Sequence, residues 1–254
     1  MTFARFNYGW CRAKSAGFTL IEMITVIVIL GVLSVGLSGF LQFGAQIYVD
    51  TTLRDHLMSS GRFAVERLNR EVRHALPNSP RISGNCLEFY PIEVAATYID
   101  IPVSPEAKSH DVTLVPFDDT NYSDSLQIAV YTVNSNDVYS STDHIFSIDS
   151  HDFTTDPNSW VITRDSDDYF AADSPSKRAY FIGPLVSYCI TGDSLVRQQG
   201  ADSAVMAKSL DASSSFLVAA PTQTRNGLVE VELVFSALNE TINFNNTIQV
   251  PNVP

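Results

Sequence analysis

The chain has 254 residues, of which 16 are Lys or Arg and 28 are Asp or Glu, so its formal net charge is −12. Apolar residues make up 45% of the sequence and charged residues 17%, which excludes a wholly disordered, collagen-like or coiled-coil chain. The acidic excess also argues against nucleic acid as a partner, because binding to phosphates needs clustered Lys and Arg.

The amino-terminal region has the pattern of a membrane segment. Residues 1–17 contain Arg5, Arg12 and Lys14 and no acid, and the only charge in residues 18–49 is Glu22. This apolar run exceeds the ~20 residues that a helix needs to cross a bilayer. Basic residues before it and acids after it predict a single pass through a membrane, with the amino terminus in the cytoplasm and the remainder outside.

Three interpretations of this segment compete, namely a secretory signal, a permanent anchor and a processed anchor. A signal peptide could be cut after the small residues Ser34 to Gly36, and an exported enzyme with a mature terminus near Leu37 would result. However, Glu22 would then lie in the apolar core, where insertion of a carboxylate costs about 2.5–3.5 kcal/mol at mid-helix. At the entry of a retained helix the cost is lower, because the carboxylate can reach the interface.

The helical pattern continues beyond the membrane segment. Apolar or small residues recur at three- and four-residue steps at Leu53, Leu57, Gly61, Ala64, Val65, Leu68, Val72 and Ala75. Such a stripe predicts an amphipathic helix, which should end near Pro77. We therefore expect one helix from Phe18 to about Leu76, with the stripe packed on the downstream domain. Two side-chain pairs at i, i+4 are expected on it, Glu66–Arg70 and Arg67–Glu71.

Beyond Pro77 the pattern is that of β-strands. Runs rich in β-branched and aromatic residues occupy residues 86–92, 94–101, 126–133, 160–163, 185–191, 227–235 and 241–250, and the last two should form a hairpin. Residues 102–124 and 134–158 are polar and rich in aspartate, so long loops are expected there. The predicted fold class is α+β, with one long amino-terminal helix packed on an antiparallel sheet.

The region after the helix has no pattern typical of a catalytic or metal site. No serine-hydrolase, zinc-protease, phosphate-loop or Cys-x-x-Cys motif occurs, so no enzyme and no cofactor are predicted. Two acidic clusters could be read as calcium sites, Asp118/Asp119/Asp124 and Asp165/Asp167/Asp168/Asp173. Neither has the spacing of a twelve-residue calcium loop, so solvated loop acids are the favoured interpretation. His144 and His151 lie among aspartates and are read as ordinary polar loop residues.

The segment from Gly17 to Glu22, Gly-Phe-Thr-Leu-Ile-Glu, resembles the processing site of type IV prepilins and pseudopilins, with a short basic leader before it and an unbroken apolar run after it. The resemblance implies that a prepilin peptidase cuts between Gly17 and Phe18 and methylates the new terminus at Phe18. It also implies that the Glu22 carboxylate pairs with the terminal amine of a neighbouring subunit, since a charge in an apolar bundle needs a partner.

The resemblance implies an organisation of the whole chain. Residues 1–17 would be a cleaved leader, 18–49 the transmembrane half of the helix, 50–76 its amphipathic periplasmic half, and 77–254 a β-rich head. Removing the three basic residues of the leader leaves 13 against 28 acids, a net charge of −15. The implied partners are the prepilin peptidase, other pilin and minor pilin subunits, and the inner-membrane assembly platform.

Four further segments resemble the minor pilins of the mannose-sensitive haemagglutinin (MSHA) pilus, of the MshO type: residues 46–52, 66–71, 183–189 and 250–254. This resemblance implies a role in starting pilus assembly, near the tip. The J-type minor pseudopilins of type II secretion are the alternative, and a displayed adhesin or ligand-binding module is a second one.

Loss of the leader would remove Cys11 and leave Cys86 and Cys189, an even pair on two expected strands. In the oxidising periplasm we predict a disulfide between them. Two buried free thiols are the alternative, because cysteine is common in cores.

Overall fold

The computed structural model describes residues 17–222, 225–238 and 240–251. The rest of the expected leader, Cys11 included, lies outside the described residues. The chain divides into two compact units, Met1–Thr52 and Leu53–Pro254, and each is described by itself below.

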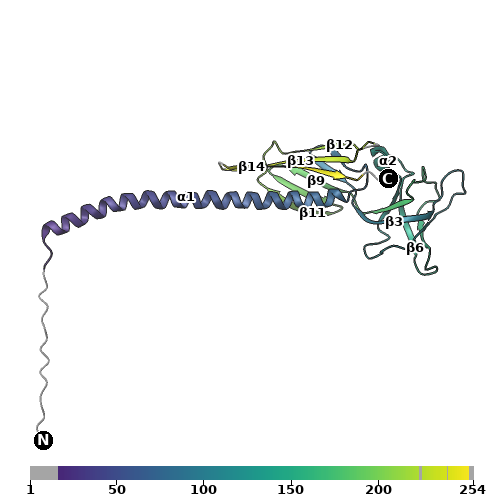
Figure 1. Ribbon diagram of the computed structural model, residues 1–254, viewed down its shortest axis with the longest axis horizontal. Helices are drawn as coiled ribbons and strands as arrows, with labels where there is room; N and C mark the ends of the chain where they lie inside the picture. The colour runs from purple at the N-terminus through teal and green to yellow at the C-terminus, as the bar shows by residue number, and fades with distance from the viewer. Residues whose placement is uncertain (1–16, 223–224, 239, 252–254) are drawn as a thin grey trace, which may run out of the picture. The chain divides into compact units, whose positions relative to one another are not determined.

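Helix α1 (Leu20–Arg73) is continuous and passes from the first unit into the second (Figure 1). It begins two residues later than expected from the sequence and ends three residues earlier. The early end has a physical reason, because Pro77 disfavours helical backbone at the residue before it. The chain becomes strand-like there: Ala75 forms a bridge with Pro91, and the Leu76 amide donates to the Tyr90 carbonyl over 2.8 Å.

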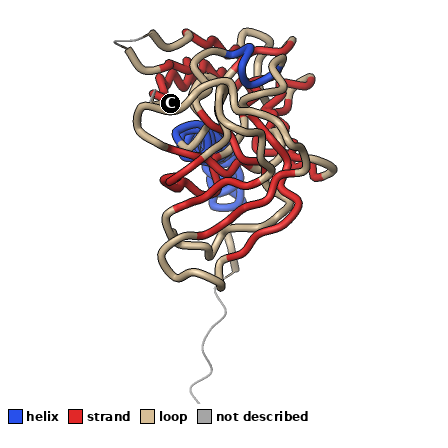
Figure 2. The backbone as a smooth tube through the Cα atoms, turned by 90° about the vertical axis from the view of Figure 1, so that its right-hand side faces the viewer, coloured by secondary structure: helices blue, strands red, loops and turns tan. Residues whose placement is uncertain are grey.

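The part of α1 in the second unit is held by an apolar core. The expected stripe is confirmed: its buried members within the helix are Leu57, Gly61, Ala64, Leu68 and Val72. They share one core with residues from two separate sheets, including Phe89 and Tyr188 from one sheet and Phe235 and Ile248 from the other. Strands accordingly lie on more than one side of the helix (Figure 2).

Both sheets that contact α1 are antiparallel. The larger one has the order β1-β2-β9-β10-β11, with bounds β1 (Arg81–Ser83), β2 (Cys86–Phe89), β9 (Val186–Thr191), β10 (Ser194–Gln199) and β11 (Asp202–Lys208). The smaller one has the order β12-β13-β14, with bounds β12 (Ser215–Ala219), β13 (Gly227–Ala237) and β14 (Glu240–Val250). The expected hairpin is confirmed as β13–β14.

A closed barrel of the order β3-β4-β7-β6-β5-β8 stands between β2 and β9 in the chain. Its strands are β3 (Ile92–Asp100), β4 (Asp111–Leu114), β5 (Gln127–Val130), β6 (Ile145–Asp152), β7 (Trp160–Arg164) and β8 (Arg178–Ile182). The barrel has its own core, and no residue of α1 belongs to it. The α+β class is confirmed, but the single expected sheet is corrected to two sheets and a barrel.

The two expected long loops are also corrected in part. Residues 102–124 contain β4, and residues 134–158 contain the short helix α2 (Ser135–Tyr139) and β6. Both strands are short or largely exposed, and only alternate residues face the core, as at Val112 and Leu114. Their hydrophobic signal is therefore diluted by aspartate and serine on the outer face.

A small third core joins the barrel to the end of α1. It contains Leu76, Ala129, Val138, Tyr180 and Ile182, contributed by the segment after α1, by β5, by α2 and by β8. Arg81 on β1 adds a contact, because its guanidinium lies 3.5 Å from the centre of the Tyr139 ring.

Gly61 allows α1 and β14 to pack closely. A Cβ atom added at this glycine would lie 2.1 Å from a ring carbon of Phe244. Gly61→Ala is therefore expected to lower the free energy of unfolding by about 1–3 kcal/mol through overpacking, although the same change in an open helix gains about 1 kcal/mol. Urea unfolding of the full chain in detergent measures this loss. Combining Gly61→Ala with Phe244→Leu should restore much of it, and no loss in the single variant would contradict the packing.

Glu71 ties the helix to the larger sheet. Its carboxylate accepts from Arg67 one turn earlier and from Nε of Arg197 on β10, at 2.8 Å. The expected Arg67–Glu71 pair is thus confirmed, whereas no Glu66–Arg70 ion pair occurs among the described residues. Burial raises the pKa of the adjacent Tyr188 phenol, and the negative charge of Glu71 raises it further.

Four buried or half-buried tyrosines should make the head sensitive to alkali. Burial is the main cause of a raised pKa at Tyr98, Tyr122, Tyr139 and Tyr188. In the unfolded chain these phenols ionise near pH 10. The folded state then holds more protons than the unfolded state, so stability present below pH ~10 falls as the pH rises above it.

We expect these four phenols to ionise only together with unfolding. Absorbance of tyrosinate against pH, recorded alongside circular dichroism, measures both events. Tyr98→Phe and Tyr188→Phe should each reduce by one the number of phenols that ionise together with unfolding. Full ionisation of every tyrosine near pH 10 with the fold intact would contradict the expectation.

Candidate processing and assembly site

The start of α1 is built around Thr19. Gly17, Phe18 and Thr19 precede the helix, and the Glu22 amide donates to Oγ1 of Thr19 over 3.3 Å. This is the hydrogen bond of a helix amino-terminal cap, and Thr-x-x-Glu is the sequence pattern of a capping box. Sequence reasoning missed the role of Thr19, although this spacing was a signal for it. The cap sets the start of the helix at Leu20, two residues after Phe18, whose side chain is 78% exposed.

Glu22 lies in the first turn of α1, where the partial positive charge of the helix terminus favours a carboxylate. Its side chain is exposed, and it has no salt bridge within the part of the chain that the structure describes. The three residues singled out in the sequence, Gly17, Phe18 and Glu22, therefore lie within one short capped segment. A cation supplied from outside the described chain could reach the carboxylate.

The helix that follows this segment is apolar and uncovered. Every residue from Phe18 to Val49 is exposed. Within the described residues, α1 is the one helix whose length and composition suit a membrane crossing, and none of its most apolar window is buried. A run of 32 such residues is unfavourable in water, because each uncovered aliphatic side chain costs about 1.5–3 kcal/mol relative to burial. It needs either lipid or other apolar helices around it.

Three hydroxyl side chains in the apolar part of α1 donate to the backbone of the helix itself. Thr25 Oγ1 donates to the Glu22 carbonyl over 2.9 Å, Ser34 Oγ to Leu30 over 2.7 Å, and Ser38 Oγ to Ser34 over 2.8 Å. These hydroxyls therefore need no water, which makes the segment compatible with hydrocarbon.

The family described as the prokaryotic N-terminal methylation motif matches residues 12–38, which include the capped segment and about the first two thirds of the apolar run. The match supports a type IV pilin-like protein. The motif is that of inner-membrane-anchored structural pilin subunits, which are processed by prepilin peptidase and assemble with other pilins; it is not that of an enzyme family. One long amino-terminal helix packed on antiparallel sheets is a pilin-like arrangement. No curated protein and no solved structure matches the chain.

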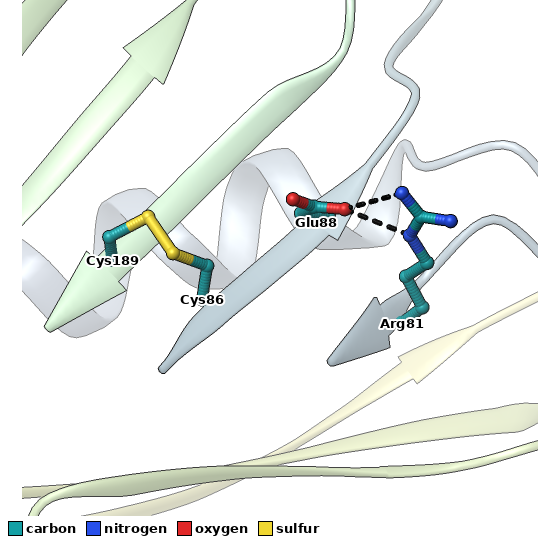
Figure 3. The surroundings of a disulfide bond; sticks show 4 residues. All are labelled: Arg81, Cys86, Glu88 and Cys189. Carbon is teal, nitrogen blue, oxygen red and sulfur yellow. Dashed lines mark hydrogen bonds and ion pairs between the residues drawn. A yellow bond between two sulfur atoms is a disulfide. The ribbon is translucent and has the colours of Figure 1, made fainter. Parts of the chain in front are cut away.

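The two cysteines paired in the sequence analysis are joined in the structure (Figure 3). Cys86 and Cys189 are register partners on β2 and β9, their Sγ atoms are 2.04 Å apart, and their Cα atoms are 4.0 Å apart. A neighbouring cross-strand pair ties β2 to the edge strand, since Arg81 donates from Nε to Glu88 Oε2 over 2.8 Å. The disulfide and this ion pair therefore link β2, the strand that precedes the barrel in the chain, to both of its neighbours, β9 and β1.

Acids of the two clusters form hydrogen bonds or ion pairs with other residues of the barrel region. Asp118 accepts from Thr120, Asp168 pairs with Lys108 at 2.8 Å, and Asp173 accepts from the Tyr98 hydroxyl. Hydrogen bonds from Thr120 hold the pKa of Asp118 below its usual range. Among the described residues, no three His, Cys, Asp or Glu side chains come together in a way that could hold a metal ion.

His144 and His151, which lie among aspartates in the sequence, have separate partners. His144 is buried, with Nδ1 3.2 Å from the Val130 carbonyl oxygen, whereas Nδ1 of His151 lies 2.7 Å from Oδ1 of Asp124. They are not brought together into one site.

Proposed function

We propose that the protein is a minor pilin or pseudopilin that is cut between Gly17 and Phe18, methylated at Phe18, and packed through its helix into a filament. The observation that carries this proposal is the uncovered apolar run from Phe18 to Val49, which starts at the residue after the motif glycine and lies almost entirely in α1. Its division into a leader (1–17), a membrane half (18–49), an amphipathic half (50–76) and a head (77–254) belongs to the same proposal.

Glu22 is the proposed charge partner in assembly. Cleavage after Gly17 would create a terminal amine four residues before Glu22, and two helices packed in parallel with a small axial offset would place that amine beside the carboxylate of a neighbour. In an apolar bundle, both charges need such a partner. Support comes from the exposed position of Glu22 and from its lack of a salt bridge among the described residues.

The finer assignment proposed is a subunit of an MSHA-type pilus, orientated with its head in the periplasm and incorporated near the tip by the inner-membrane assembly platform. It is supported by the four short segments quoted above, and the barrel makes the head larger than the helix-covering sheets require. A minor pseudopilin of type II secretion is the alternative assignment. No catalytic role is proposed.

The mature amino terminus tests the proposal. Mass spectrometry of the protein purified from membranes should give a polypeptide that begins at methylated Phe18. A terminus near Leu37, or an intact Met1, would contradict it. As a control, Gly17→Ile should retain the leader, because a bulky side chain replaces the small residue at the cut.

A displayed binding module is the second candidate function, and the barrel favours it. The barrel core is separate from the core that covers α1, so the residues of the barrel core are not needed to bury the helix. Deletion of the gene should reduce the number of pili if the protein starts assembly. Normal pili with lost surface binding would favour the second candidate.

A further inference from the structure

We propose that the free edge of β14 pairs with an extended strand from a different pilin-like subunit of the same assembly. This inference rests on the proposed function, and it adds a contact between heads to the packing of helices.

Strand β14 is long and regular. Its eleven residues pair with β13 from Ala237↔Glu240 to Gly227↔Val250 with no shift in register. On its other side, no backbone hydrogen bond reaches β14 from any residue that the structure describes. An open edge of this kind presents a row of unpaired N–H and C=O groups, which is a template for another strand.

The edge of β14 lacks the devices that normally prevent such pairing. It contains no proline, no lysine and no bulge, and its exposed side chains are polar but uncharged: Thr241, Asn243, Asn245, Thr247 and Gln249. The edge strand β11 differs, because it pairs with β10 across a bulge at Leu195/Val196 and carries Asp202 and Lys208 at its ends. The remaining edge strands, β1 and β12, are short and lie beside each other.

Charge favours this edge as the place where subunits meet. The mature chain would carry a net charge of −15, so two such heads repel each other. In β14 the one charged residue is Glu240 at its start, and that carboxylate lies 4.0 Å from Arg54. An uncharged edge can be covered without desolvating a carboxylate, which would cost several kcal/mol.

The position of β14 along α1 adds to this argument. Phe244 packs at Gly61, and Glu240 lies beside Arg54, so β14 starts against the helix residues that follow the apolar run in sequence. Neighbours packed by their helices would therefore bring a second head towards this part of the chain.

The partner is a different subunit and not a second copy. Pairing β14 with β14 of a copy would form a closed two-fold dimer, whereas a filament needs contacts between different surfaces. The copy offers no other edge of matching length and regularity, because β11 is bulged and β1 and β12 are short. The fitting partner is an uncharged, extended segment of another pilin-like chain.

Photo-crosslinking of the full-length protein in cells tests the inference. With benzoylphenylalanine at Asn245, we expect a covalent adduct whose second component, identified by mass spectrometry, carries a prepilin motif and differs from this chain. The same probe at Ser203 on β11 is the matched control and should give at least tenfold less of that adduct. Adding Asn243→Lys and Thr247→Lys should reduce the Asn245 adduct by a similar factor, whereas Ser203→Lys and Val205→Lys should not.

Two results would overturn the inference while leaving the proposed function intact: no adduct at Asn245, or an adduct only with a second copy, from a protein whose terminus is methylated Phe18. A mature terminus at another residue would overturn the proposed function, and the inference with it. Equal melting temperatures of the two lysine variants would show that the loss of adduct does not come from unfolding.

Discussion

Replacing Glu22 by valine is expected to leave the terminus at methylated Phe18 and to reduce incorporation into filaments by at least about tenfold. The substitution keeps the helix apolar and leaves the residues around the cut unchanged, so processing should continue. It would leave the amine of a neighbouring subunit without a partner in an apolar bundle, and breaking a buried ion pair in this way costs about 3–5 kcal/mol. Quantification of the protein in sheared filaments and in membranes measures the effect.

Two controls separate charge from shape. Glu22→Asp keeps the carboxylate and should retain part of the incorporation, whereas Glu22→Gln keeps the size and should lose as much as valine. Unchanged assembly of the valine variant would refute the pairing role of Glu22.

Removal of the Cys86–Cys189 bond is expected to lower the free energy of unfolding of the head by about 4–5 kcal/mol. The bond joins residues 103 positions apart, and the chain-entropy model gives this magnitude for a loop of that length. Urea unfolding of the full-length Cys86→Ser/Cys189→Ser variant in detergent, compared with the oxidised wild type, measures the loss.

Reduction provides the control for this comparison. A reducing agent should shift the unfolding of the wild type towards that of the double variant and should not change the variant itself. A loss below about 1 kcal/mol would show that the β2–β9 ladder holds without the bond.

Local periodicity predicted the parts of the fold whose partners are near in sequence. The 3.6-residue stripe from Leu53 to Val72 located the buried face of α1, and Pro77 located its end to within a turn. Alternation in β13 and β14 located the hairpin, because a short turn leaves these strands few other partners.

The barrel could not be predicted from the same signals. Its closure depends on pairs such as β3 with β8, whose register partners are 81 to 90 residues apart in the chain. It also depends on β4 and β6, whose outer faces are rich in aspartate and serine. Pairing over such separations is set by the packing of the whole core and not by any single window of sequence.

The candidate site, in contrast to the barrel, depends on a contiguous motif, and the roles of its residues stay predictions. Gly17, Phe18 and Glu22 could be named from the motif alone, and the structure adds the cap by Thr19. No sequence motif marks the free edge of β14, since edge strands and central strands show the same alternation of apolar and polar residues.

The placement of the barrel between two neighbouring strands has a consequence for how this protein can vary. The chain leaves the larger sheet after Phe89 and returns at Val186, and these two residues face each other as register partners. The segment between them could therefore change in length and sequence without altering the core that α1 shares with the two sheets, provided that the contacts at the end of α1 are kept. Insertions, deletions or replacements in the barrel would then alter one region of the head and leave the scaffold of α1 and its two sheets in place.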